Sequence, residues 1–425
     1  MDSPKILYIH HGSVPGGAPT SLRNLLRGLR TQAGFRLKVL CIYDSMIPFF
    51  REVEGVDVGS YCQTSVIAGR IFIGWSRGWS LRRLKLFLKE LRAVPGFIQR
   101  EMAILQAEQP DIVHLNSAIL WTTAIAAKRC GIPLVWHIRE VSTFGKHHLL
   151  RLVYTWFIRK IADAVICIGP EEYEKIEGWR SDKIILIRNS LDESYLSDPE
   201  PDTREQTREQ LGITPESFCL LSLGGNSFRK GAYQILEVIK FFPQVDITLV
   251  MAGIPPQPYT DKISLTKRVA LRLENFMVKL GMKSYYSWYY PERLAQSLQR
   301  SDSMKIRCPG IVDDVKPLIH ACDVLLFADT TSHSGRPVYE AWALKKPVIA
   351  FDSKAMRHDI EDGIDGLLVK EKTSEALASA IRYAQEHPPE LQQMGEAGYC
   401  KTVERFSLRQ NTQKVCDIYQ TLLCG

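Results

Sequence analysis

Two stretches of the chain repeat one pattern, in which a short apolar run leads into a loop with two adjacent glycines and then into an amphipathic helix. The apolar runs cover residues 5–9 and 218–223, and the glycine pairs are Gly16-Gly17 and Gly224-Gly225. Apolar runs that alternate with helical patterns are typical of parallel strands joined by crossover helices. The pattern therefore predicts an α/β protein with two Rossmann-like domains.

The remaining apolar runs predict the other strands of these domains. They lie at residues 35–43, 56–58, 110–117, 133–140, 162–168, 183–192, 246–253, 323–329 and 348–351. The polar stretch 197–210, which contains two prolines, predicts the linker between the domains. The stretch 399–423 predicts a C-terminal helix. Polar residues follow several strands, at the edge where open α/β sheets bind ligands.

A histidine at that edge is the first candidate for chemistry. His137 lies near the end of the run 133–140. A histidine at a strand end is more often a satisfied structural group than a ligand contact, and the residues alone leave both interpretations open. His114, in the preceding run, is a weaker candidate of the same kind.

The two glycine loops are candidates for phosphate binding. A glycine pair before a helix lets main-chain N–H groups and the positive helix end approach a pyrophosphate. Lys230, after the second pair, adds a charge whose hydrogen bonds to phosphate are worth about 1.5–3 kcal/mol each. Alone, Gly16-Gly17 is more often an ordinary turn, and its spacing does not match the GxGxxG fingerprint.

A third loop lies between the runs 323–329 and 348–351, where residues 331–343 predict a turn and a helix. Such a βαβ unit presents free N–H groups at the start of its helix, so an anionic ligand is expected there. Glu340, about one helical turn after Arg336, would lie too deep for phosphate but could accept hydrogen bonds from ribose hydroxyls. The alternative is a solvent-exposed helix glutamate.

Composition narrows the class of protein. The chain has 425 residues of which 45% are hydrophobic, enough for two or three domains with substantial cores. Its ten cysteines form no CxxC pair and no Cys/His cluster at metal spacing, which indicates reduced, buried thiols and no metal site. We see no signal-peptide pattern and no apolar run of about 18 residues. We expect a cytoplasmic protein, soluble or peripheral at the membrane.

The net charge of +7 is concentrated in two stretches. Residues 65–100 carry eight Lys/Arg and one acid, and residues 262–307 carry ten and three. In 81–91 the leucines form one helical stripe bordered by basic residues, and Phe72, Trp75 and Trp79 precede it. This composition favours a helix lying on an anionic membrane. The alternative is that the leucines face the core and the basic residues are solvated.

Several of these stretches resemble one known family. Residues 335–343, Gly-Arg-Pro-Val-Tyr-Glu-Ala-Trp-Ala, with Pro347-Val348, resemble the second half of the Glu-x7-Glu signature of the family-four retaining glycosyltransferases of the GT-B fold. Gly16-Gly17 resembles the family's N-terminal glycine loop. Gly224 and Lys230-Gly231 are similar to its Gly-Arg-x4-Lys-Gly element, and His137 to the histidine of its Thr-x-His segment.

The resemblance implies two Rossmann-like domains facing across a cleft, with a C-terminal helix that crosses back to the N-terminal domain. Residues 1–195 would form the acceptor-side domain, with a basic insertion at about 65–100. Residues 196–400 would form the nucleotide-sugar-binding domain, with an insertion at about 255–305. Residues 401–425 would be the returning helix.

The resemblance also implies roles for individual residues. The catalytic set is His137 at the donor sugar with Lys230 and Arg229 at the diphosphate, and Glu340 holds the nucleotide ribose. The other substrate contacts are Gly16, Gly17, Gly224, Ser332, Gly335, Arg336 and Val338. Three positions depart from the family pattern. Ser332 stands where the first glutamate is expected, and Lys345 stands where a glycine is usual before Pro347-Val348. Gly225 stands where arginine is usual, with Arg229 as the candidate substitute.

The function implied is transfer of a sugar from a nucleotide-diphosphate sugar to an acceptor hydroxyl, with retention of configuration and without a metal ion or other cofactor. The acceptor would be a lipid-linked or glycan precursor at the membrane. The alternative is a catalytically silent GT-B protein that binds nucleotide or glycan as a membrane-associated partner. The basic excess also suits a nucleic-acid binder, but no nucleic-acid module is visible, and we expect no such partner.

Overall fold

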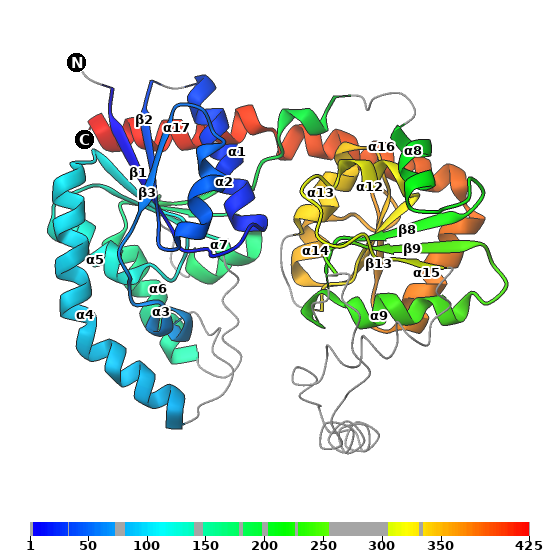
Figure 1. The fold of residues 1–425 in the computed structure, drawn as a ribbon, viewed down its shortest axis with the longest axis horizontal. Coiled ribbons are helices and arrows are strands. Elements are labelled where there is room, and N and C mark those ends of the chain that lie inside the picture. Colours follow the sequence, from blue (N-terminus) through cyan, green and yellow to red (C-terminus); the bar gives the residue numbers. More distant parts are fainter. Residues whose placement is uncertain are drawn as a thin grey trace. The chain divides into compact units, whose positions relative to one another are not determined.

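The computed structural model describes residues 3–32, 34–72, 81–139, 148–177, 182–197, 203–225, 228–254, 305–330 and 335–424 (Figure 1). The chain divides into two compact units, called unit 1 (Met1–Glu193 with Arg405–Gly425) and unit 2 (Ser194–Glu404). Each unit contains one parallel β-sheet with helices packed against it. The prediction of two Rossmann-like domains is confirmed.

The sheet of unit 1 has seven strands in the order β3-β2-β1-β4-β5-β6-β7. They are β1 (Lys5–His10), β2 (Arg36–Cys41), β3 (Val56–Ser60), β4 (Ile112–Leu115), β5 (Leu134–Ile138), β6 (Ala164–Cys167) and β7 (Ile184–Leu186). In β1, Ile6 pairs with Leu37 of β2 and with Ile112 of β4. The strand order reverses direction between β1 and β4.

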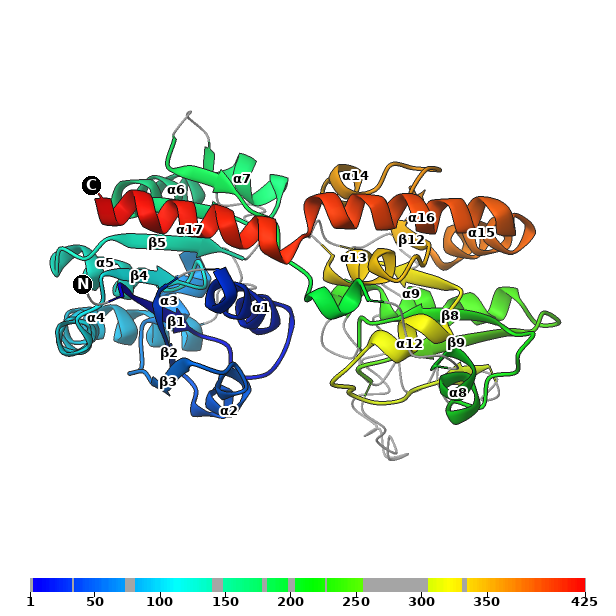
Figure 2. The ribbon, with the colours of Figure 1, turned by 90° about the horizontal axis from the view of Figure 1, so that it is seen from above.

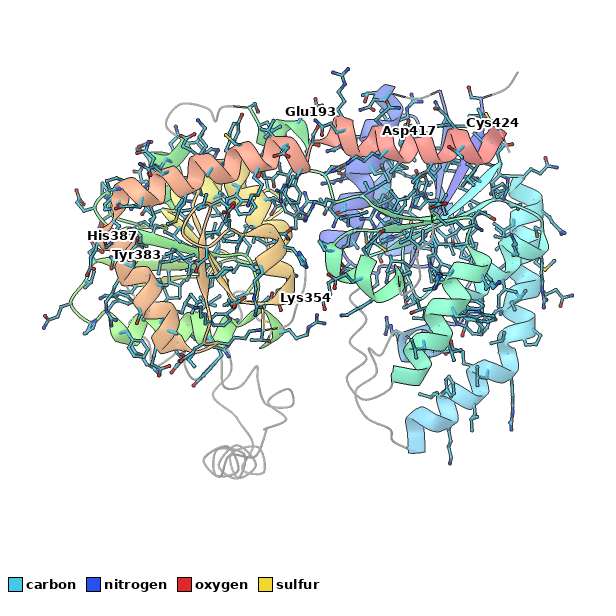
Figure 3. The ribbon with its side chains drawn as sticks, turned by 180° about the vertical axis from the view of Figure 1, so that it is seen from behind. Glu193, Lys354, Tyr383, His387, Asp417 and Cys424 are labelled. Carbon is cyan, nitrogen blue, oxygen red and sulfur yellow. The ribbon has the colours of Figure 1, made fainter. Side chains whose placement is uncertain are left out.

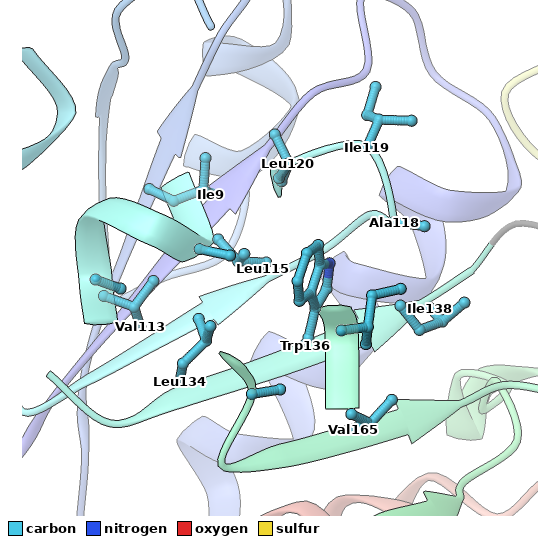
Figure 4. Close-up of a cluster of buried hydrophobic side chains, with 14 of the residues drawn as sticks. Ile9, Val113, Leu115, Ala118, Ile119, Leu120, Leu134, Trp136, Ile138 and Val165 are labelled. Carbon is cyan, nitrogen blue, oxygen red and sulfur yellow. The ribbon is translucent and has the colours of Figure 1, made fainter. Parts of the chain in front are cut away.

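Helices cover both faces of this sheet because successive side chains of a strand point to opposite sides. They are α1 (Gly17–Gln32), α2 (Ile47–Arg51), α3 (Val66–Phe72), α4 (Leu81–Glu108), α5 (Trp121–Arg129), α6 (His148–Ile161), α7 (Pro170–Glu177) and α17 (Leu408–Cys424), with the 3-10 helix η1 (Asp44–Met46). Ile6 and Tyr8 of β1 pack against α1 and α17. Leu7 and Ile9 face the opposite core, which α4, α5 and α6 cover. Figure 4 shows Trp136 of β5 within that second core.

The last helix, α17, packs along α1 in unit 1 (Figures 1 and 2). Gly28 of α1 allows the close approach, since a Cβ there would lie 2.3 Å from Thr412 Oγ1. The face of α17 that carries Cys416 and Tyr419 is buried. Asp417 and Cys424, labelled in Figure 3, lie on its exposed face. This amphipathic helix is therefore part of the unit 1 core.

The sheet of unit 2 has six parallel strands in the order β10-β9-β8-β11-β12-β13. They are β8 (Phe218–Ser222), β9 (Ile247–Met251), β10 (Ile306–Arg307), β11 (Val324–Phe327), β12 (Val348–Phe351) and β13 (Leu367–Val369). The strand order reverses between β8 and β11. The segment η2 (Glu193–Tyr195) spans the junction with unit 1.

The helices of unit 2 are α8 (Thr203–Gln210), α9 (Ala232–Glu237), α12 (Lys316–Ala321), α13 (Arg336–Ala343), α14 (Lys354–Asp359), α15 (Ser374–Glu386) and α16 (Pro388–Arg405), with the 3-10 helices η3 (Phe228–Lys230) and η4 (Val238–Phe241). Leu377 and Ile381 of α15 pack with Ile235 of α9 over one face of the sheet. Most of the predicted basic insertion, residues 255–304, lies outside the described residues.

Part of the predicted linker 197–210 is a helix, α8, so that prediction is wrong for residues 203–210. Arg208 donates to the carbonyl of Ala321 at 3.0 Å, and Arg204 donates to the carbonyl of Cys322 at 3.0 Å. Those carbonyls lie at the end of α12, where cationic donors are favourable. Two of the polar residues that suggested a linker, Arg204 and Arg208, thus hold α8 against the end of α12.

The predicted C-terminal helix is two helices, α16 and α17, separated by Phe406 and Ser407. The side chain of Phe406 is buried, and its carbonyl accepts a hydrogen bond from Leu191 N at 3.1 Å. Docking of this residue explains the interruption of a stretch whose residues otherwise favour continuous helix.

Candidate functional site

The predicted site residues follow strands at the carboxyl edges of the two sheets. In open α/β sheets, ligands bind at that edge where the strand order reverses. In unit 1 the reversal lies between β1 and β4, and Gly16 and Gly17 follow β1. In unit 2 it lies between β8 and β11, and Gly224 and Lys230 follow β8, while Arg336 begins the helix after β11.

The glycine loop of unit 1 ends at the first turn of α1. The carbonyl of Gly16 accepts a hydrogen bond from Thr20 N at 3.0 Å, so Gly16 caps the helix. A Cβ at Gly16 or Gly17 would meet nothing within 4 Å, and both residues are exposed. The first turn of α1 contains no acidic residue. The space beside these two glycines is therefore open, and no carboxylate of the first turn competes for the helix end.

His137 lies on β5 within a row of buried hydrogen-bonded side chains. Its Nδ1 is 3.2 Å from His114 Nε2 and 3.4 Å from a guanidinium nitrogen of Arg139. His114 Nδ1 in turn lies 2.6 Å from the hydroxyl of Tyr419 on α17, which lies 2.6 Å from the hydroxyl of Tyr8. Burial, with the charge of Arg139 nearby, holds the pKa of both histidines well below the usual range. Both rings are therefore neutral at pH 7.

Arg139 connects the strand ends around His137. Its Nε donates to Asn116 Oδ1 and its NH1 to Asn189 Oδ1, each at 2.5 Å. Asn116 also contacts His10 Nδ1 at 3.2 Å, across the reversal between β1 and β4. Burial, with a smaller contribution from neighbouring charges, lowers the pKa of His10 to about 3. The carboxyl edge of unit 1 is thus held by a buried polar network.

The loop after β8 in unit 2 is tied to the end of β11. Thr330 donates to the carbonyl of Arg229 from both its N–H at 2.7 Å and its hydroxyl at 2.9 Å. A Cβ at Gly224 would lie 3.1 Å from Lys230 Cβ, so the chain folds back closely here. Lys230 is exposed and has no ion-pair partner among the described residues. Its ammonium group is available to an anion at the strand-order reversal.

Gly225, where the family pattern has arginine, adopts a left-handed conformation with φ of +60°. Its N–H donates to the carbonyl of Ala252 at 3.1 Å, and a Cβ there would lie 3.0 Å from the carbonyl oxygen of Gly253. A side chain at this position would strain the backbone and crowd that carbonyl. The local chain path therefore favours glycine at this departure from the family pattern.

The start of α13 places Gly335, Arg336 and Glu340 together in unit 2. Gly335 passes over Phe327 of β11 so closely that a Cβ would lie 2.6 Å from the ring. Arg336 Nε donates to Glu340 Oε1 at 2.6 Å, and Glu340 also bonds the side chain of Tyr195. Burial raises the pKa of Glu340, although Arg336 opposes the shift. Because its side chain is buried, the alternative of a solvent-exposed glutamate is wrong.

Val338 and Ser332 are the remaining predicted contacts of this loop and helix. Val338 is only 1% exposed, and its N–H donates to the carbonyl of Gly335 at 2.9 Å, so its side chain packs in the core. Ser332 lies outside the described residues, as do Trp75 and Trp79.

Sequence reasoning did not single out several residues of these two edges. Arg139, Asn116 and Asn189 follow strands, and the rule that polar residues gather at strand ends could have identified them. Tyr195 and Tyr419 carry no such signal. Tyr419 is 305 residues from His114 in the chain, so only folding brings the two side chains together.

Comparison with known proteins matches a glycosyltransferase family model to each half of the chain. The family model described as Glycosyltransferase Family 4 matches residues 15–195, and the one described as Glycosyl transferases group 1 matches residues 203–401. The chain belongs to the family-four glycosyltransferases of the GT-B fold. The resemblance predicted from residues 335–343, the two glycine loops and His137 is therefore confirmed at the level of the family.

Individual members of this glycosyltransferase family are distant. EpsD of Bacillus subtilis (strain 168), whose name describes it as a candidate glycosyltransferase, is 24% identical over 336 residues, covering 75% of this chain and 79% of EpsD. The lipopolysaccharide core biosynthesis glycosyltransferase LpsE of Rhizobium meliloti (strain 1021) is 28% identical over 265 residues, covering 62% of this chain and 64% of LpsE.

The fold is that of solved glycosyltransferases. The structure of HepE from Anabaena in complex with UDP and glucose matches with a TM-score of 0.72 at 20% identity, covering 98% of this chain and 99% of HepE. WaaG, described as a glycosyltransferase involved in lipopolysaccharide biosynthesis, matches with a TM-score of 0.64 at 16% identity, covering 97% and 99%. Among the described residues, no helix is long and apolar enough to cross a membrane.

Proposed function

We propose that this glycosyltransferase moves a sugar from a nucleotide-diphosphate sugar to an acceptor hydroxyl, with retention of configuration. One observation carries the proposal. The residues expected at the donor, among them Gly17, Lys230 and Glu340, follow strands that border the order reversal in their own sheets, where α/β sheets bind ligands. HepE is described with UDP and glucose, which makes UDP-sugars the first donors to test.

Each expected role follows from the chemistry of the group. The helix amides near Gly16 and Gly17 and the exposed ammonium of Lys230, with Arg229, stabilise the negative charge that develops on the leaving diphosphate. The leaving phosphate oxygen accepts the proton of the acceptor hydroxyl, so the proposal needs no protein nucleophile. It also includes no metal ion, because lysine, arginine and helix amides supply the positive charge.

Glu340 is the proposed ribose contact. Its carboxylate accepts from Arg336 on one side, which keeps it oriented, and a carboxylate has enough lone pairs to accept ribose hydroxyls as well. Its burial strengthens such hydrogen bonds because little water competes for them. Arg336 is therefore proposed to orient Glu340 rather than to bind phosphate itself.

The proposed acceptor is a lipid-linked or glycan precursor, reached from the cytoplasmic face of an anionic membrane. On α4, Leu86 and Leu88 are exposed by 43% and 45%, beside the exposed Lys85 and Lys89. Exposure of Leu88 counts against the alternative in which this leucine stripe faces the core. The name of LpsE supports a lipid-linked acceptor.

A neighbouring helix extends the apolar surface. On α6, Leu152, Val153 and Trp156 are 58%, 55% and 59% exposed. This helix contacts α3, which also contacts α4. A tryptophan beside aliphatic and basic residues suits the interface of a bilayer. We therefore include α6 in the proposed membrane surface.

The activity is tested by incubating the purified protein with UDP-, GDP- and ADP-sugars and following donor hydrolysis and transfer. Hydrolysis or transfer that Lys230→Ala abolishes supports the proposal. Nucleotide binding without any turnover, measured as a rise in melting temperature with nucleoside diphosphates, supports the catalytically silent alternative instead. No binding to any nucleotide would overturn both.

The membrane contact is tested by sedimentation with vesicles of phosphatidylcholine alone and with added phosphatidylglycerol. We expect binding only to the anionic vesicles and weaker binding of Trp156→Ser. Ile311→Ser, which removes an exposed apolar side chain of unit 2, is the matched control. Equal binding of both variants would contradict the proposed surface.

A further inference from the structure

Four buried side chains of unit 1 form an unbroken row of hydrogen bonds that ends at His137. The row runs from Tyr8 on β1 through Tyr419 on α17 and His114 on β4 to His137 on β5. Tyr8, Tyr419 and His114 are inaccessible to solvent, and His137 is 4% exposed. Bulk solvent does not reach these groups, so the hydrogen bonds they make to one another decide where their protons lie.

The order of the protons follows from the Tyr8 end. Within the described residues, the Tyr8 hydroxyl contacts no acceptor other than the Tyr419 hydroxyl, at 2.6 Å. A tyrosine has one proton to donate, and a buried donor without an acceptor is costly. Tyr8 therefore donates to Tyr419. Tyr419 cannot donate back, so its proton goes to His114 Nδ1, at 2.6 Å.

The same reasoning continues through the histidines. His114 is neutral and accepts at Nδ1, so its single proton is on Nε2. That N–H donates to His137 Nδ1 at 3.2 Å. His137, neutral as well, then has its proton on Nε2.

The position of Arg139, at the opposite end of the row, also indicates that His137 Nδ1 carries no proton. Its guanidinium nitrogen lies 3.4 Å from His137 Nδ1, and a guanidinium only donates. A proton on His137 Nδ1 would point at that N–H group. The reversed order would also leave the buried Tyr8 proton without an acceptor. Of the two orders, only the one that starts at Tyr8 gives the Tyr8 proton an acceptor and leaves His137 Nδ1 free to accept from Arg139.

His137 Nε2 is buried and has no hydrogen-bond partner among the described residues. We propose that Tyr419 and His114 are positioning residues that hold His137 as the Nε2–H tautomer, so that His137 presents a hydrogen-bond donor, not a base, to an oxygen of the bound nucleotide sugar. The oxygen is a sugar hydroxyl or a phosphate oxygen, since both accept. This inference rests on the proposed function for the identity of the ligand, but the tautomer belongs to the protein alone.

Two tyrosine variants separate this role from packing. Tyr419→Phe removes the proton that His114 Nδ1 accepts. Without that donor on α17, nothing in the row decides which ring nitrogen of His114 carries the proton. Tyr8→Phe removes an equally buried hydroxyl, but Tyr419 still has His114 Nδ1 as its acceptor, so the order is retained. Tyr8→Phe is therefore the matched control.

The first measurement is nitrogen NMR of the ligand-free protein labelled with ¹⁵N in its histidine rings. The signals of His137 are assigned by their loss in His137→Gln. At pH 7 we expect protonated Nε2 and unprotonated Nδ1 for His114 and His137. The pattern should persist in Tyr8→Phe and become mixed in Tyr419→Phe. A wild-type His137 with its proton on Nδ1, or on both nitrogens, would overturn the inference whether or not the protein transfers sugar.

The second measurement is the rate of transfer from the donor that the activity screen identifies. We expect Tyr419→Phe to lower kcat about tenfold, the worth of one hydrogen bond, with little change in KM for the donor. Tyr8→Phe should stay within about twofold of wild type. Equal losses in the two variants would show that the hydroxyls matter only for packing.

The chemistry of position 137 itself provides a third measurement. Glutamine offers an N–H donor and cannot act as a base, whereas glutamate at pH 7 only accepts. We expect His137→Gln to retain about tenfold more activity than His137→Glu. Greater activity of the glutamate variant would indicate a base and contradict the inference.

Discussion

The carboxyl edges of the two sheets hold their predicted site residues by different kinds of contact. In unit 1, His137 is held by a row of side chains whose members are up to 411 residues apart. In unit 2, Arg336 and Glu340 are four residues apart on one helix, and Gly224 lies against Lys230 within one loop. The same fold thus builds one edge from long-range contacts and the other from local ones.

The two edges also differ in the charge of the side chains that they carry. Burial lowers the pKa values of His10, His114 and His137, so these rings of unit 1 are neutral. Unit 2 instead brings the charges of Arg336, Glu340 and Lys230 to its edge. Neutral rings position a ligand by the direction of their hydrogen bonds, whereas charged groups provide affinity for a diphosphate. Changes to these charged groups of unit 2 should therefore affect donor binding, and changes to the buried row of rings in unit 1 should affect turnover.

Loss of the buried ion pair in unit 2 should have the largest effect. Arg336→Ala leaves Glu340 buried without its cation, and removing one partner of a buried pair costs about 3–5 kcal/mol. We expect a fall of that order in the free energy of unfolding, measured in urea. Arg357→Ala breaks the Arg357–Asp352 pair, which has the same 2.6 Å distance but a 67% exposed arginine, and should cost less than about 1 kcal/mol. Similar losses of unfolding free energy in the two variants would show that burial does not explain the effect of Arg336→Ala.

A buried carboxyl of unit 1 offers the contrasting case. Glu101 accepts from the hydroxyls of Thr122 and Thr123, and burial raises its pKa to about 7. The folded state therefore holds this proton more tightly than the unfolded chain does. Its contribution to stability is complete below the unfolded pKa of 4.5 and is lost as the pH rises through about 7.

We expect Glu101→Gln to remove this dependence and to be more stable than wild type at pH 8 by about 2–3 kcal/mol, since one pKa unit corresponds to about 1.4 kcal/mol. At pH 4.5 the difference should be small. The measurement is urea unfolding of both proteins across this pH range. A difference that does not change with pH would show that burial does not shift the pKa of this carboxyl from its value in the unfolded chain.

Replacing the exposed Lys230 of unit 2 should weaken donor binding without loss of stability. Lys230 is exposed and lacks an ion-pair partner among the described residues, so Lys230→Ala should leave the melting temperature unchanged. We expect nucleoside-diphosphate affinity to fall about a hundredfold, within the range of charge-assisted hydrogen bonds. Calorimetric titration measures this, with Lys370→Ala as the exposed-lysine control. An equal effect of both substitutions would point to general electrostatic attraction.

The smallest effect is expected at the glycine loop of unit 1. A Cβ at Gly17 meets nothing within 4 Å, so Gly17→Ala should not change the melting temperature. It should weaken donor binding several-fold by keeping the diphosphate from the helix amides. Gly231→Ala is the contrast, because its φ is +69° and its Cβ would lie 2.2 Å from Ala328 O, so it should destabilise unit 2. Unchanged donor affinity in Gly17→Ala would separate this loop from the site.

The sequence predicted the edge of unit 2 more fully than the edge of unit 1, because the contacts of unit 2 are local and those of unit 1 are long-range. The edge of unit 2 was predicted because its residues stand in short motifs, such as Gly335, Arg336 and Glu340. At the edge of unit 1 the glycine pair, His137 and, as a weaker candidate, His114 were named. The two tyrosines of the row were not, since Tyr8 and Tyr419 are at opposite ends of the chain. The linker prediction failed at α8 because composition does not reveal that Arg204 and Arg208 bind the end of α12.

By itself the sequence determined the α/β class, nearly all the strands and the family, because apolar periodicity and local motifs are properties of neighbouring residues. Only the tertiary structure decided that Glu340 is buried against Arg336, that Leu88 faces solvent, and which ring nitrogens of His114 and His137 meet. Burial and hydrogen-bond partners depend on residues that folding brings together from distant positions, and no local pattern specifies them.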